Sequence, residues 1–384
     1  MHLQIVTRFF LPIKAGVETH CYEVAKRVGK MGHEATVLTR DDGFNKGDRL
    51  PPEEIIDGFK VHRSSSNRAL TKLLDFNEPI YLNNFDMSLT FSLYTRALLS
   101  WFHGKRPKIW LVPHGGFTPY WGMFSLPRRS VKGIYHLTLG RYFINNLTCG
   151  VSALNVWEKD QLIKAGVDEK LITIKTNGVE DIAFDLPPQR LEDNGLAWLS
   201  GRKYILMLCR VSREKNIDRM IEAISNQQDV HLIIGGSIQD QSYYDELNAL
   251  TSRTGMADRV HFVGYVSEGK KYALIDGALA LALISLYECD PITVKESLAR
   301  GIPIITSNIG PLPSIVLDGM NGFLADQENV TSISSAIAKA MTLSPKDRSK
   351  MEVENKSKAI DYRWESVTAS LIRDIELCEG MKNG

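Results

Sequence analysis

The chain has 384 residues, of which 43% are hydrophobic and 24% are charged, and its formal net charge is +1. This length exceeds what one ordinary hydrophobic core needs and suits two domains of similar size. The near-neutral charge excludes a protein that binds polyanions through its overall charge, and the longest apolar run, which begins at Ala278, is too short to span a membrane.

In the first half, short apolar runs alternate with amphipathic stretches. The residues 19–32 are typical of a helix that ends at Gly32. Residues 1–18 lack the long apolar stretch and the cleavage site of a signal peptide, so the N-terminus is expected to form the first strand. The strands predicted here are LQIVTRFF (3–10), EATVLTR (34–40), KIWLVPH (108–114) and LTCGVS (147–152).

A long segment of the first half carries no acidic residue. Between Asp86 and Glu158 there are 71 residues without Asp or Glu, and basic and aromatic side chains are interleaved there. One interpretation is a solvated basic face over an ordinary core. The other is a surface for anionic headgroups or for a phosphate-bearing acceptor. The basic residues are Arg96, Lys105, Arg106, Lys108, Arg128, Arg129, Lys132 and Arg141, and the aromatic ones are Trp101, Phe102, Trp110, Tyr120, Trp121, Phe124, Tyr135, Tyr142 and Phe143.

Between the halves, residues 183–201 contain Pro-Pro, acidic residues and glycines, and they interrupt the periodicity, so a linker is predicted there. The second half then repeats the alternation of strands and helices. Such alternation predicts an α/β fold with two doubly wound, Rossmann-like parallel-sheet domains facing a central cleft. The strands predicted here are 204–210, 230–236, 260–264, 278–285 and 303–307, and the helices are 216–225, 242–255 and 293–301.

The stretch ECDPITVKE, residues 288–296, follows one of these strands. Asp290 is a good N-cap and Pro291 fits the first helical position, so Glu288 is expected in the loop before a helix and Glu296 about one and a half turns into it. A helix N-terminus suits a diphosphate, and a carboxylate suits the paired hydroxyls of a ribose or hexose. An exposed helix face also produces such pairs, and spacing alone favours that interpretation.

Two cations, Arg210 and Lys215, stand where another strand passes into a helix. They could neutralise a diphosphate and stabilise it as a leaving group, although an ordinary surface loop would look the same. No Asp-x-Asp element or His/Asp cluster indicates a metal. Gly16 after the first strand and His114 at the end of a middle strand are weaker candidates, since a single glycine or histidine is more often structural.

Six motifs, in their order and spacing over nearly the whole chain, resemble the retaining nucleotide-sugar glycosyltransferases of group 1, family 4, which have the two-domain GT-B fold. The motifs are MGHEATVLT (31–39), His114-Gly115, NGVE (177–180), Arg210 with Lys215, Glu288 with Glu296 before ARGIPII (299–305), and RWESVTASL (363–371).

The resemblance implies a role for each candidate. Glu288 would hold the hydroxyls of the donor sugar, Glu296 the ribose, and Arg210 and Lys215 the diphosphate, while His114 would position the sugar. The substrate-binding set would also include Gly16 in the first loop, Tyr265 and Val266 near the base, and Asp290, Ile292 and Thr293 at the helix start.

The resemblance also implies how the domains divide. An N-terminal acceptor-side domain (1–182) and the linker (183–201) would precede a C-terminal nucleotide-sugar domain (202–360). A last helix (361–384) would cross back to the first domain. The chain departs from the family where Cys289-Asp290-Pro291 replaces the usual Gly-Phe-Gly, because Pro291 has no N–H to offer the sugar. Ala15 and Cys209 also stand where the family often has glycine.

The sequence therefore predicts a metal-independent retaining enzyme that needs no cofactor and moves a hexose from a UDP- or GDP-sugar to a glycan or lipid-linked acceptor. The five scattered cysteines, none with metal or redox spacing, indicate a reducing cytoplasmic location, with the inner face of an anionic membrane as an alternative. Two rival interpretations stay open: a non-catalytic subunit of a glycan-assembly complex, and a nucleotide-sugar epimerase or phosphorylase of the same fold. No nucleic acid partner is expected, and a dehydrogenase is disfavoured because no Gly-x-Gly-x-x-Gly follows a strand.

Overall fold

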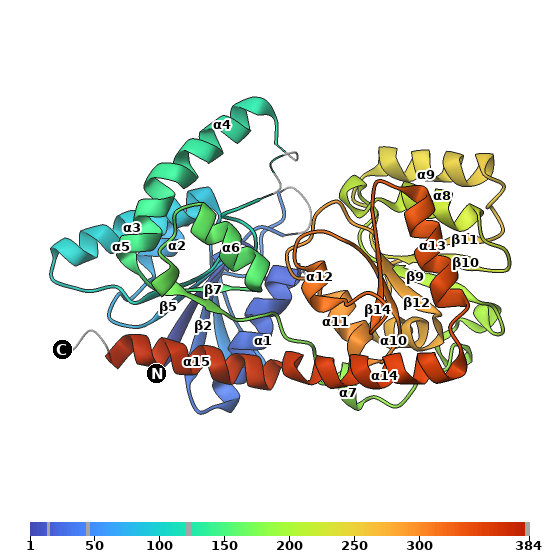
Figure 1. Ribbon diagram of the computed structural model, residues 1–384. Helices are drawn as coiled ribbons and strands as arrows, with labels where there is room; N and C mark the ends of the chain where they lie inside the picture. Colours follow the sequence, from blue (N-terminus) through green and yellow to red (C-terminus); the bar gives the residue numbers. More distant parts are fainter. Residues whose placement is uncertain (14–15, 44–46, 120, 122–123, 381–384) are drawn as a thin grey trace. The chain divides into compact units, whose positions relative to one another are not determined.

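The computed structural model describes residues 1–13, 16–43, 47–119, 121 and 124–380. They form two compact units, Met1–Gly178 with Trp364–Gly384, and Val179–Arg363. Each unit is a mainly parallel sheet with helices packed on it (Figure 1). The predicted fold class, two α/β domains with parallel sheets, is confirmed.

The N-terminal unit has an eight-stranded sheet in the order β3-β4-β2-β1-β5-β6-β7-β8, and only β3 is antiparallel to its neighbour. The central strands are buried on both faces, which is why they read as continuous apolar runs. The sequence analysis did not predict β3, β4, β5 or β8. The strands are β1 His2–Val6, β2 Glu34–Arg40, β3 Glu53–Ile56, β4 Phe59–Ser64, β5 Ile80–Asn83, β6 Ile109–Val112, β7 Thr148–Ala153 and β8 Ile172–Ile174.

The helices of this unit follow the strands as crossover connections. The helix predicted for 19–32 is α1, and Gly32 after it has a φ of +80°, a conformation that favours glycine. A π-helical turn, η2, joins α4 to α5. The helices are α1 Gly16–Lys30, α2 Asn67–Lys72, α3 Met87–Phe102, α4 Leu126–Tyr135, η2 His136–Gly140, α5 Arg141–Leu147, α6 Val156–Lys164, η3 Glu169–Leu171 and α15 Trp364–Gly380.

The C-terminal unit has a six-stranded, entirely parallel sheet in the order β11-β10-β9-β12-β13-β14. Its strands are β9 Tyr204–Leu208, β10 His231–Gly235, β11 Val260–Gly264, β12 Ala280–Leu283, β13 Ile304–Ser307 and β14 Gly322–Ala325. Its longer helices are α8 Ile217–Ser225, α9 Gln241–Arg253, α10 Glu268–Gly277, α11 Ile292–Ala299, α13 Val330–Met341 and α14 Pro345–Ala359. Its short helical turns are α7 Ile182–Asp185, η4 Glu192–Asn194, η5 Ala197–Leu199, η6 Arg213–Lys215, α12 Leu312–Ile315 and η7 Ile360–Tyr362.

The segment predicted as a linker, residues 183–201, is instead folded into the C-terminal unit. Leu196 and Leu199 are buried in the same apolar cluster as Tyr204. Arg300 also donates hydrogen bonds to the carbonyl oxygens of Ala183 (3.2 Å) and Leu186 (2.5 Å). The Pro-Pro and glycine signals therefore mark short turns that cross the surface of a domain rather than a free connection.

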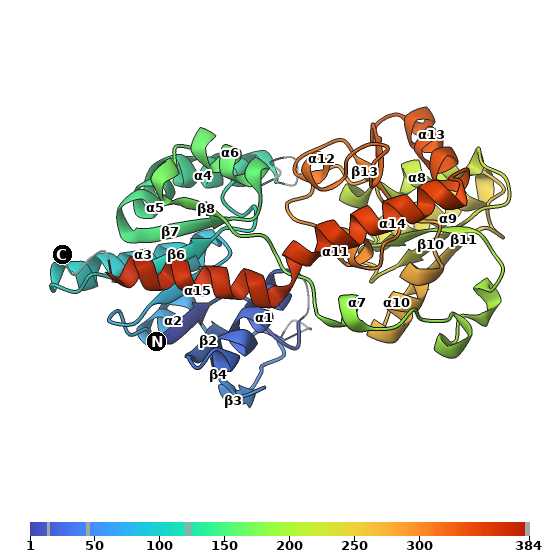
Figure 2. The same cartoon turned by 60° about the horizontal axis from the view of Figure 1, so that its bottom comes forward.

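The last helix, α15, belongs to the N-terminal unit, where it lies beside α1 (Figure 2). The indole of Trp364 is fully buried at its start, and a side chain at Gly178 would overlap that ring, so only glycine fits there. Lys175 forms an ion pair with Asp374 at 2.9 Å. These contacts fasten the C-terminal end of the chain to the first domain.

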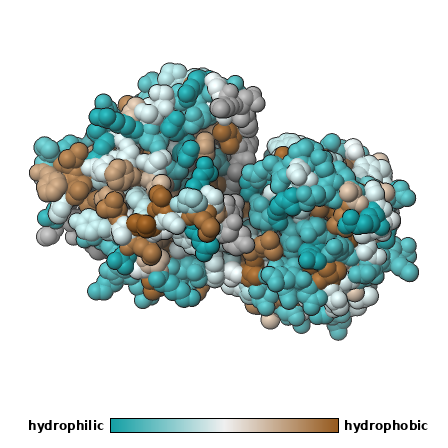
Figure 3. Space-filling model, turned by 90° about the horizontal axis from the view of Figure 1, so that it is seen from above, coloured by the Kyte–Doolittle hydropathy of each residue, from teal (hydrophilic) through white to brown (hydrophobic). Residues whose placement is uncertain are grey.

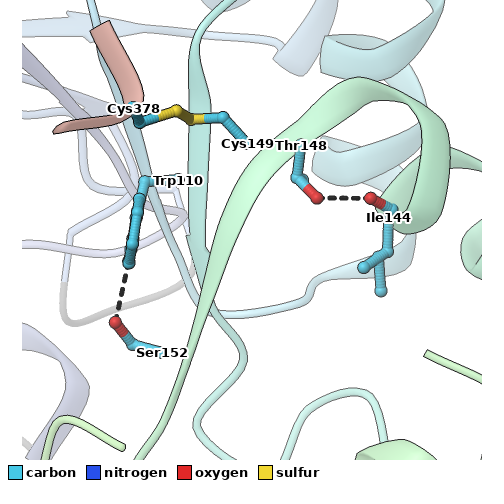
Figure 4. The surroundings of a disulfide bond; sticks show 6 residues. All are labelled: Trp110, Ile144, Thr148, Cys149, Ser152 and Cys378. Atoms are coloured by element: carbon cyan, nitrogen blue, oxygen red, sulfur yellow. Dashed lines mark hydrogen bonds between the residues drawn. A yellow bond between two sulfur atoms is a disulfide. The ribbon is translucent and has the colours of Figure 1, made fainter. Parts of the chain in front are cut away.

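A disulfide bond joins Cys149 on β7 to Cys378 on α15, with 6.1 Å between the two Cα atoms (Figure 4). No pairing of cysteines was predicted from the sequence, so this disulfide is an addition to the prediction. The two residues are 229 apart in the chain, and only the return of α15 to the first sheet brings them together. Among the described residues, Cys21, Cys209 and Cys289 are not part of a disulfide bond.

In the described part of the chain, every helix is too short or too polar to cross a bilayer.

Candidate active site

The order of the C-terminal sheet identifies where a ligand would bind. The chain runs outward from β9 through β10 to β11, then returns to β12 on the other side of β9 and continues to β14. The loops after β9 and β12 therefore diverge at neighbouring strands. Open α/β sheets bind ligands at such a point, beyond the carboxyl ends of the strands. Arg210 and Lys215 follow β9, and Glu288 follows β12.

The structure brings Lys215 and Glu288 together. The Lys215 ammonium donates to Glu288 Oε1 at 2.6 Å, and the two side chains are only 14% and 10% exposed. Ser285 Oγ donates to the same oxygen at 2.6 Å. A buried ion pair with a further hydrogen bond holds both side chains in one geometry. Because both contacts use Oε1, the Oε2 oxygen of Glu288 is left to accept from a hydroxyl.

The backbone ties the same two loops to each other. The Leu286 amide donates to the Glu214 carbonyl oxygen at 2.8 Å. Asn216, which ends η6, has a φ of +57°, and its side chain donates to the Gln327 carbonyl oxygen at 2.8 Å. A positive φ at a residue other than glycine is a strained conformation that surrounding contacts must hold. The position of Lys215 is therefore set by backbone as well as by its ion pair.

The other two cations of this loop point in different directions. The Arg210 side chain is 51% exposed, and its guanidinium lies 3.5 Å from Glu214 Oε1. Such a long exposed pair is weak, so Arg210 can turn to an anion at the mouth of the switch point. Arg213 instead forms a two-pronged pair with Glu246 on α9, at 2.9 and 2.6 Å.

The start of α11 differs from the prediction. Pro291, not Asp290, is the N-cap, and no side chain caps this helix. The Asp290 carboxylate accepts from the Lys295 ammonium at 2.6 Å, and each side chain is 1% exposed. The lysine four residues after the proline draws the carboxylate away from the helix end. The first-turn amides of Ile292 and Thr293 are thus free of a competing side chain, which a diphosphate oxygen requires.

Glu296 lies in a cluster of carboxylates around one lysine. The Lys271 ammonium on α10 donates to Glu296 Oε1 at 2.6 Å, so Glu296 is paired and buried rather than exposed on a helix face. Glu180 is the nearby residue of the NGVE motif. Burial and a hydrogen bond with Glu268 raise the pKa of Glu180 to about 7, against the partial opposing effect of Lys271. Glu296, with one oxygen held by Lys271, can therefore accept hydrogen bonds from hydroxyls through its other oxygen.

Tyr265 and Val266 follow β11, at the far side of the same sheet edge. Tyr265 is 80% exposed, whereas Val266 packs on the core. Gly236 after β10 has a φ of +152°, and a side chain there would overlap the Cys209 carbonyl. The main chain at Gly236 therefore passes very close to the main chain at Cys209. The exposed ring of Tyr265 is available for stacking on a flat group.

His114 lies in the N-terminal unit, at the carboxyl end of β6, with a φ of +49°. Its Nε2 lies 2.7 Å from Asn83 Oδ1. The Asn83 amide group donates to the Val17 carbonyl oxygen at 3.1 Å, so its oxygen accepts and His114 Nε2 carries the proton. Burial, and to a lesser extent His20, hold the pKa of His114 well below its ordinary value. The imidazole is therefore neutral at neutral pH, and Nδ1 is its acceptor.

A second histidine, which the sequence analysis did not select, organises this unit. His20 on α1 contacts Asn177 Oδ1 and the Tyr81 hydroxyl, each at 2.7 Å. Its ring lies 4.8 Å from that of His114 and 5.2 Å from that of Trp364. β5, which carries Tyr81 and Asn83, neighbours β1 at the switch point of the first sheet. Gly16 begins α1 after β1 and is exposed, whereas Ala15 lies outside the described residues.

The sequence analysis also missed Lys271 and Lys295, which pair with two of the acids it selected. Lys295 is only five residues from its partner Asp290, so the two were close enough in sequence to be considered as a pair. Lys271 gave no such signal, since its partner is 25 residues away. Arg210, predicted as the last residue of a strand, lies two residues after the end of β9.

Comparison with known families matches both halves of the chain. Residues 15–181 match the model described as Glycosyltransferase Family 4, and residues 189–358 match the model described as Glycosyl transferases group 1. Together the two matches take in every strand except β1, and all the selected residues.

Individual proteins agree with these matches. The chain is 22% identical to GDP-mannose:cellobiosyl-diphosphopolyprenol alpha-mannosyltransferase of Komagataeibacter xylinus, over 96% of the chain and 91% of that protein. It is 24% identical to alpha-monoglucosyldiacylglycerol synthase of Streptococcus pneumoniae, over 90% of the chain and 79% of that protein. The crystal structure of Anabaena HepE with UDP and glucose superposes with a TM-score of 0.77 and 18% identity, covering 98% of the chain and 99% of HepE. The superposition shows a shared fold, of the GT-B type.

Proposed function

Because the chain belongs to the group 1 glycosyltransferases, we propose that it moves a hexose from a UDP- or GDP-sugar to a glycan or lipid-linked acceptor. The transfer would keep the anomeric configuration and need no metal. The observation that carries the proposal is the Lys215–Glu288 pair at the β9/β12 switch point. One residue supplies a cation for the diphosphate and the other a carboxylate for the sugar next to it.

The charges around this pair match the parts of a nucleotide sugar. Arg210, Lys215 and the first-turn amides of α11 would bind the two phosphates and stabilise the charge that develops when the diphosphate leaves. Glu288 Oε2 would accept from the hydroxyls of the hexose, and Glu296 from those of the ribose. The exposed ring of Tyr265 would stack on the base. Neutral His114 would contact the sugar through Nδ1, with Asn83 fixing its ring.

The lysine partners prepare the acids for these roles. A carboxylate paired with a lysine stays ionised, and its side chain is held in one orientation. Each lysine contacts only Oε1 of its partner, so the other carboxylate oxygen can accept from a ligand. Donor binding therefore adds hydrogen bonds to groups that are already placed, and less side-chain entropy is lost on binding.

The relatives support the substrate classes. The Komagataeibacter enzyme is named for GDP-mannose and a diphosphopolyprenol-linked acceptor, the Streptococcus enzyme for a glycosylated diacylglycerol, and HepE was crystallised with UDP. Two of these names contain a lipid. This favours a lipid-linked acceptor over a soluble one.

The test is transfer from UDP- and GDP-hexoses to short-chain lipid-linked acceptors, with the product anomer read by proton NMR. We expect an α-product from an α-linked donor, at a rate unchanged by EDTA. Loss of the activity in Arg210→Ala and Glu296→Ala excludes a non-catalytic subunit. Inversion at the anomeric carbon would contradict retention, and a requirement for phosphate or a product without acceptor would favour the phosphorylase or the epimerase.

A further inference from the structure

The N-terminal unit has an apolar surface flanked by arginines, built from α4 and the turn η2 that continues it. Nearly half of the large apolar side chains that are exposed in the described residues lie between Phe91 and Tyr142. Figure 3 shows apolar groups gathered on the face of this unit that is seen from above, the side on which α4 lies in Figure 1. The exposed ones are Phe91, Leu99, Trp101, Phe102, Leu126, Val131, Ile134, Leu137, Leu139 and Tyr142.

α4 exposes an apolar arc on one side, although residues 126–131 are exposed all around the helix. At about 100° per residue, Leu126, Val131 and Ile134 fall within an arc of about 140°. They are 76%, 60% and 66% exposed. Leu137, in the next turn, is 59% exposed. The side that faces the domain is occupied by Tyr135 and His136, which are buried.

The positions of these buried residues follow from packing on α3. His136 Nδ1 donates to the Phe117 carbonyl oxygen at 2.6 Å, and its ring stacks on that of Phe117 at 5.0 Å. The Tyr135 ring lies 6.5 Å from that of Phe91 on α3. These contacts fix the rotation of α4, so its apolar arc is held toward solvent and cannot turn inward.

The charges of the surface have one sign. Arg128 and Arg129 fall on either side of the apolar arc, and both are exposed. The sequence has no acidic residue from Met87 to Trp157, and among the described residues no carboxylate forms an ion pair with either arginine. The long stems of arginines can lie along an apolar layer while their charged ends reach phosphates.

We propose that this surface, made of Leu126, Arg128, Arg129, Val131, Ile134 and Leu137, docks the protein on an anionic lipid bilayer. An apolar arc rimmed by cations is the pattern of a helix that lies in a membrane interface. A second copy of the chain fits less well, because a two-fold interface would bring together two copies of the same basic surface, which has no acidic residue. The inference deepens the proposed lipid-linked acceptor, yet it depends only on binding and not on transfer.

The first experiment uses the unaltered chain and vesicles without donor. Sedimentation is compared for vesicles of phosphatidylcholine alone and for vesicles in which a quarter of the lipid is phosphatidylglycerol, at low and at high salt. We expect binding to the anionic vesicles at low salt, at least about tenfold weaker binding to neutral ones, and weakening by salt. Equal binding to both, or binding that salt leaves unchanged, would overturn the proposal.

Variants then locate the surface. Leu126→Ser/Val131→Ser/Ile134→Ser is expected to abolish vesicle binding, and Arg128→Gln/Arg129→Gln to weaken it about tenfold or more. The controls are Val353→Ser, an apolar residue that is 67% exposed on α14, and Lys346→Gln/Lys350→Gln, which removes two exposed charges from the same helix. Both are expected to bind vesicles as the unaltered chain does. If the triple variant melts early, Ile134→Ser alone replaces it.

Two further readouts separate the alternatives. Sedimentation velocity shows whether the unaltered chain is a dimer that the triple serine variant disperses, and that result without vesicle binding would overturn the proposal in favour of self-association. Donor hydrolysis in the absence of lipid tests the proposed function separately. It is expected to be unchanged in the serine variant, so failure to bind membranes and failure to act on a donor remain distinguishable.

Discussion

The switch points of the two sheets are built from different chemistry. In the C-terminal unit, the loops after β9 and β12 and the helix α11 hold three ion pairs, Lys215–Glu288, Lys271–Glu296 and Lys295–Asp290. In the N-terminal unit, a single ion pair, Arg8–Asp86, joins the segments after β1 and β5 at 2.7 Å, and the buried residues beside it form hydrogen bonds between uncharged groups, among them His114 with Asn83 and His20 with Tyr81. Several buried ion pairs suit a charged ligand, whereas hydrogen bonds between uncharged buried groups suit the orientation of one ring. The first region is therefore expected to bind the diphosphate, and the second to position a sugar.

The largest effect is expected where a buried pair is broken. Lys295→Met leaves the Asp290 carboxylate in an environment where each partner is 1% exposed. Removing one member of such a pair typically costs about 3–5 kcal/mol in the free energy of unfolding. Urea denaturation measures it. In Asp290→Asn/Lys295→Met, where no charge remains, most of the loss should be recovered, and a double variant as unstable as the single one would show that the pair itself is unimportant.

A comparable effect is expected on catalysis at the same switch point. Lys215→Ala removes the cation that we propose to stabilise the leaving diphosphate, so kcat should fall by about 10²–10³. The matched control is Arg213→Ala in the same turn, because the Arg213 side chain is occupied by Glu246 on α9. Its kcat is expected to stay near that of the unaltered enzyme. Equal losses in the two variants would mean that the turn, and not the charge at Lys215, is what matters.

A smaller effect is expected in the pH dependence of the C-terminal unit. The pKa of Glu180 rises from 4.5 to about 7 on folding, because of burial and its hydrogen bond with Glu268. A carboxyl whose pKa is raised stabilises the fold while it is protonated, and this stabilisation is lost as the pH rises from about 4.5 through 7. Thermal unfolding between these values should show that loss in the unaltered chain and not in Glu180→Gln. Glu268→Gln should reduce it, and a parallel profile for all three chains would refute the assignment.

The N-terminal unit should respond in the opposite direction, by the smallest amount. The pKa of His114 is held well below 6.5 by burial. A histidine kept neutral in the fold costs stability as the pH falls below its unfolded value, since the unfolded chain takes up the proton first. Going from pH 7 to pH 5, His114→Asn should lose less stability than the unaltered chain. A histidine resonance that titrates near its ordinary pKa in the folded protein and disappears in the variant would disprove this.

Much of the fold was predictable because it depends on local pattern. Apolar runs separated by amphipathic stretches predicted the parallel strands β9 to β13 and the helices α8, α9 and α11, but not α10. The position of Glu288 and Lys215 after two of these strands followed from the same pattern. The sequence could not show that β9 and β12 are neighbours, since that depends on the order in which strands pair. It predicted that residues 183–201 connect two domains, whereas Leu196 and Leu199 bury them in one.

Most of what the sequence missed depends on long-range pairing, and Asp290 is the exception. Asp290 was expected to cap α11, but a lysine five residues on competes successfully for its carboxylate because both are buried. His20 appeared to be an ordinary helical residue, and its partners Tyr81 and Asn177 are 61 and 157 residues away. The disulfide between Cys149 and Cys378 required the return of α15. For His20 and for the two cysteines, the partner is set by tertiary packing, which no local rule contains.

The central claim is that the loops after β9 and β12 bind a nucleoside diphosphate through Lys215. Thermal shifts with UDP, GDP and ADP, and with their sugars, test it most directly, since a ligand at about 100 times its Kd stabilises the fold by about 2.7 kcal/mol. We predict that UDP or GDP raises the Tm of the unaltered chain and of Arg213→Ala, and that the shift is lost in Lys215→Ala. A shift of the same size in Lys215→Ala, or no shift with any nucleotide, would contradict the account.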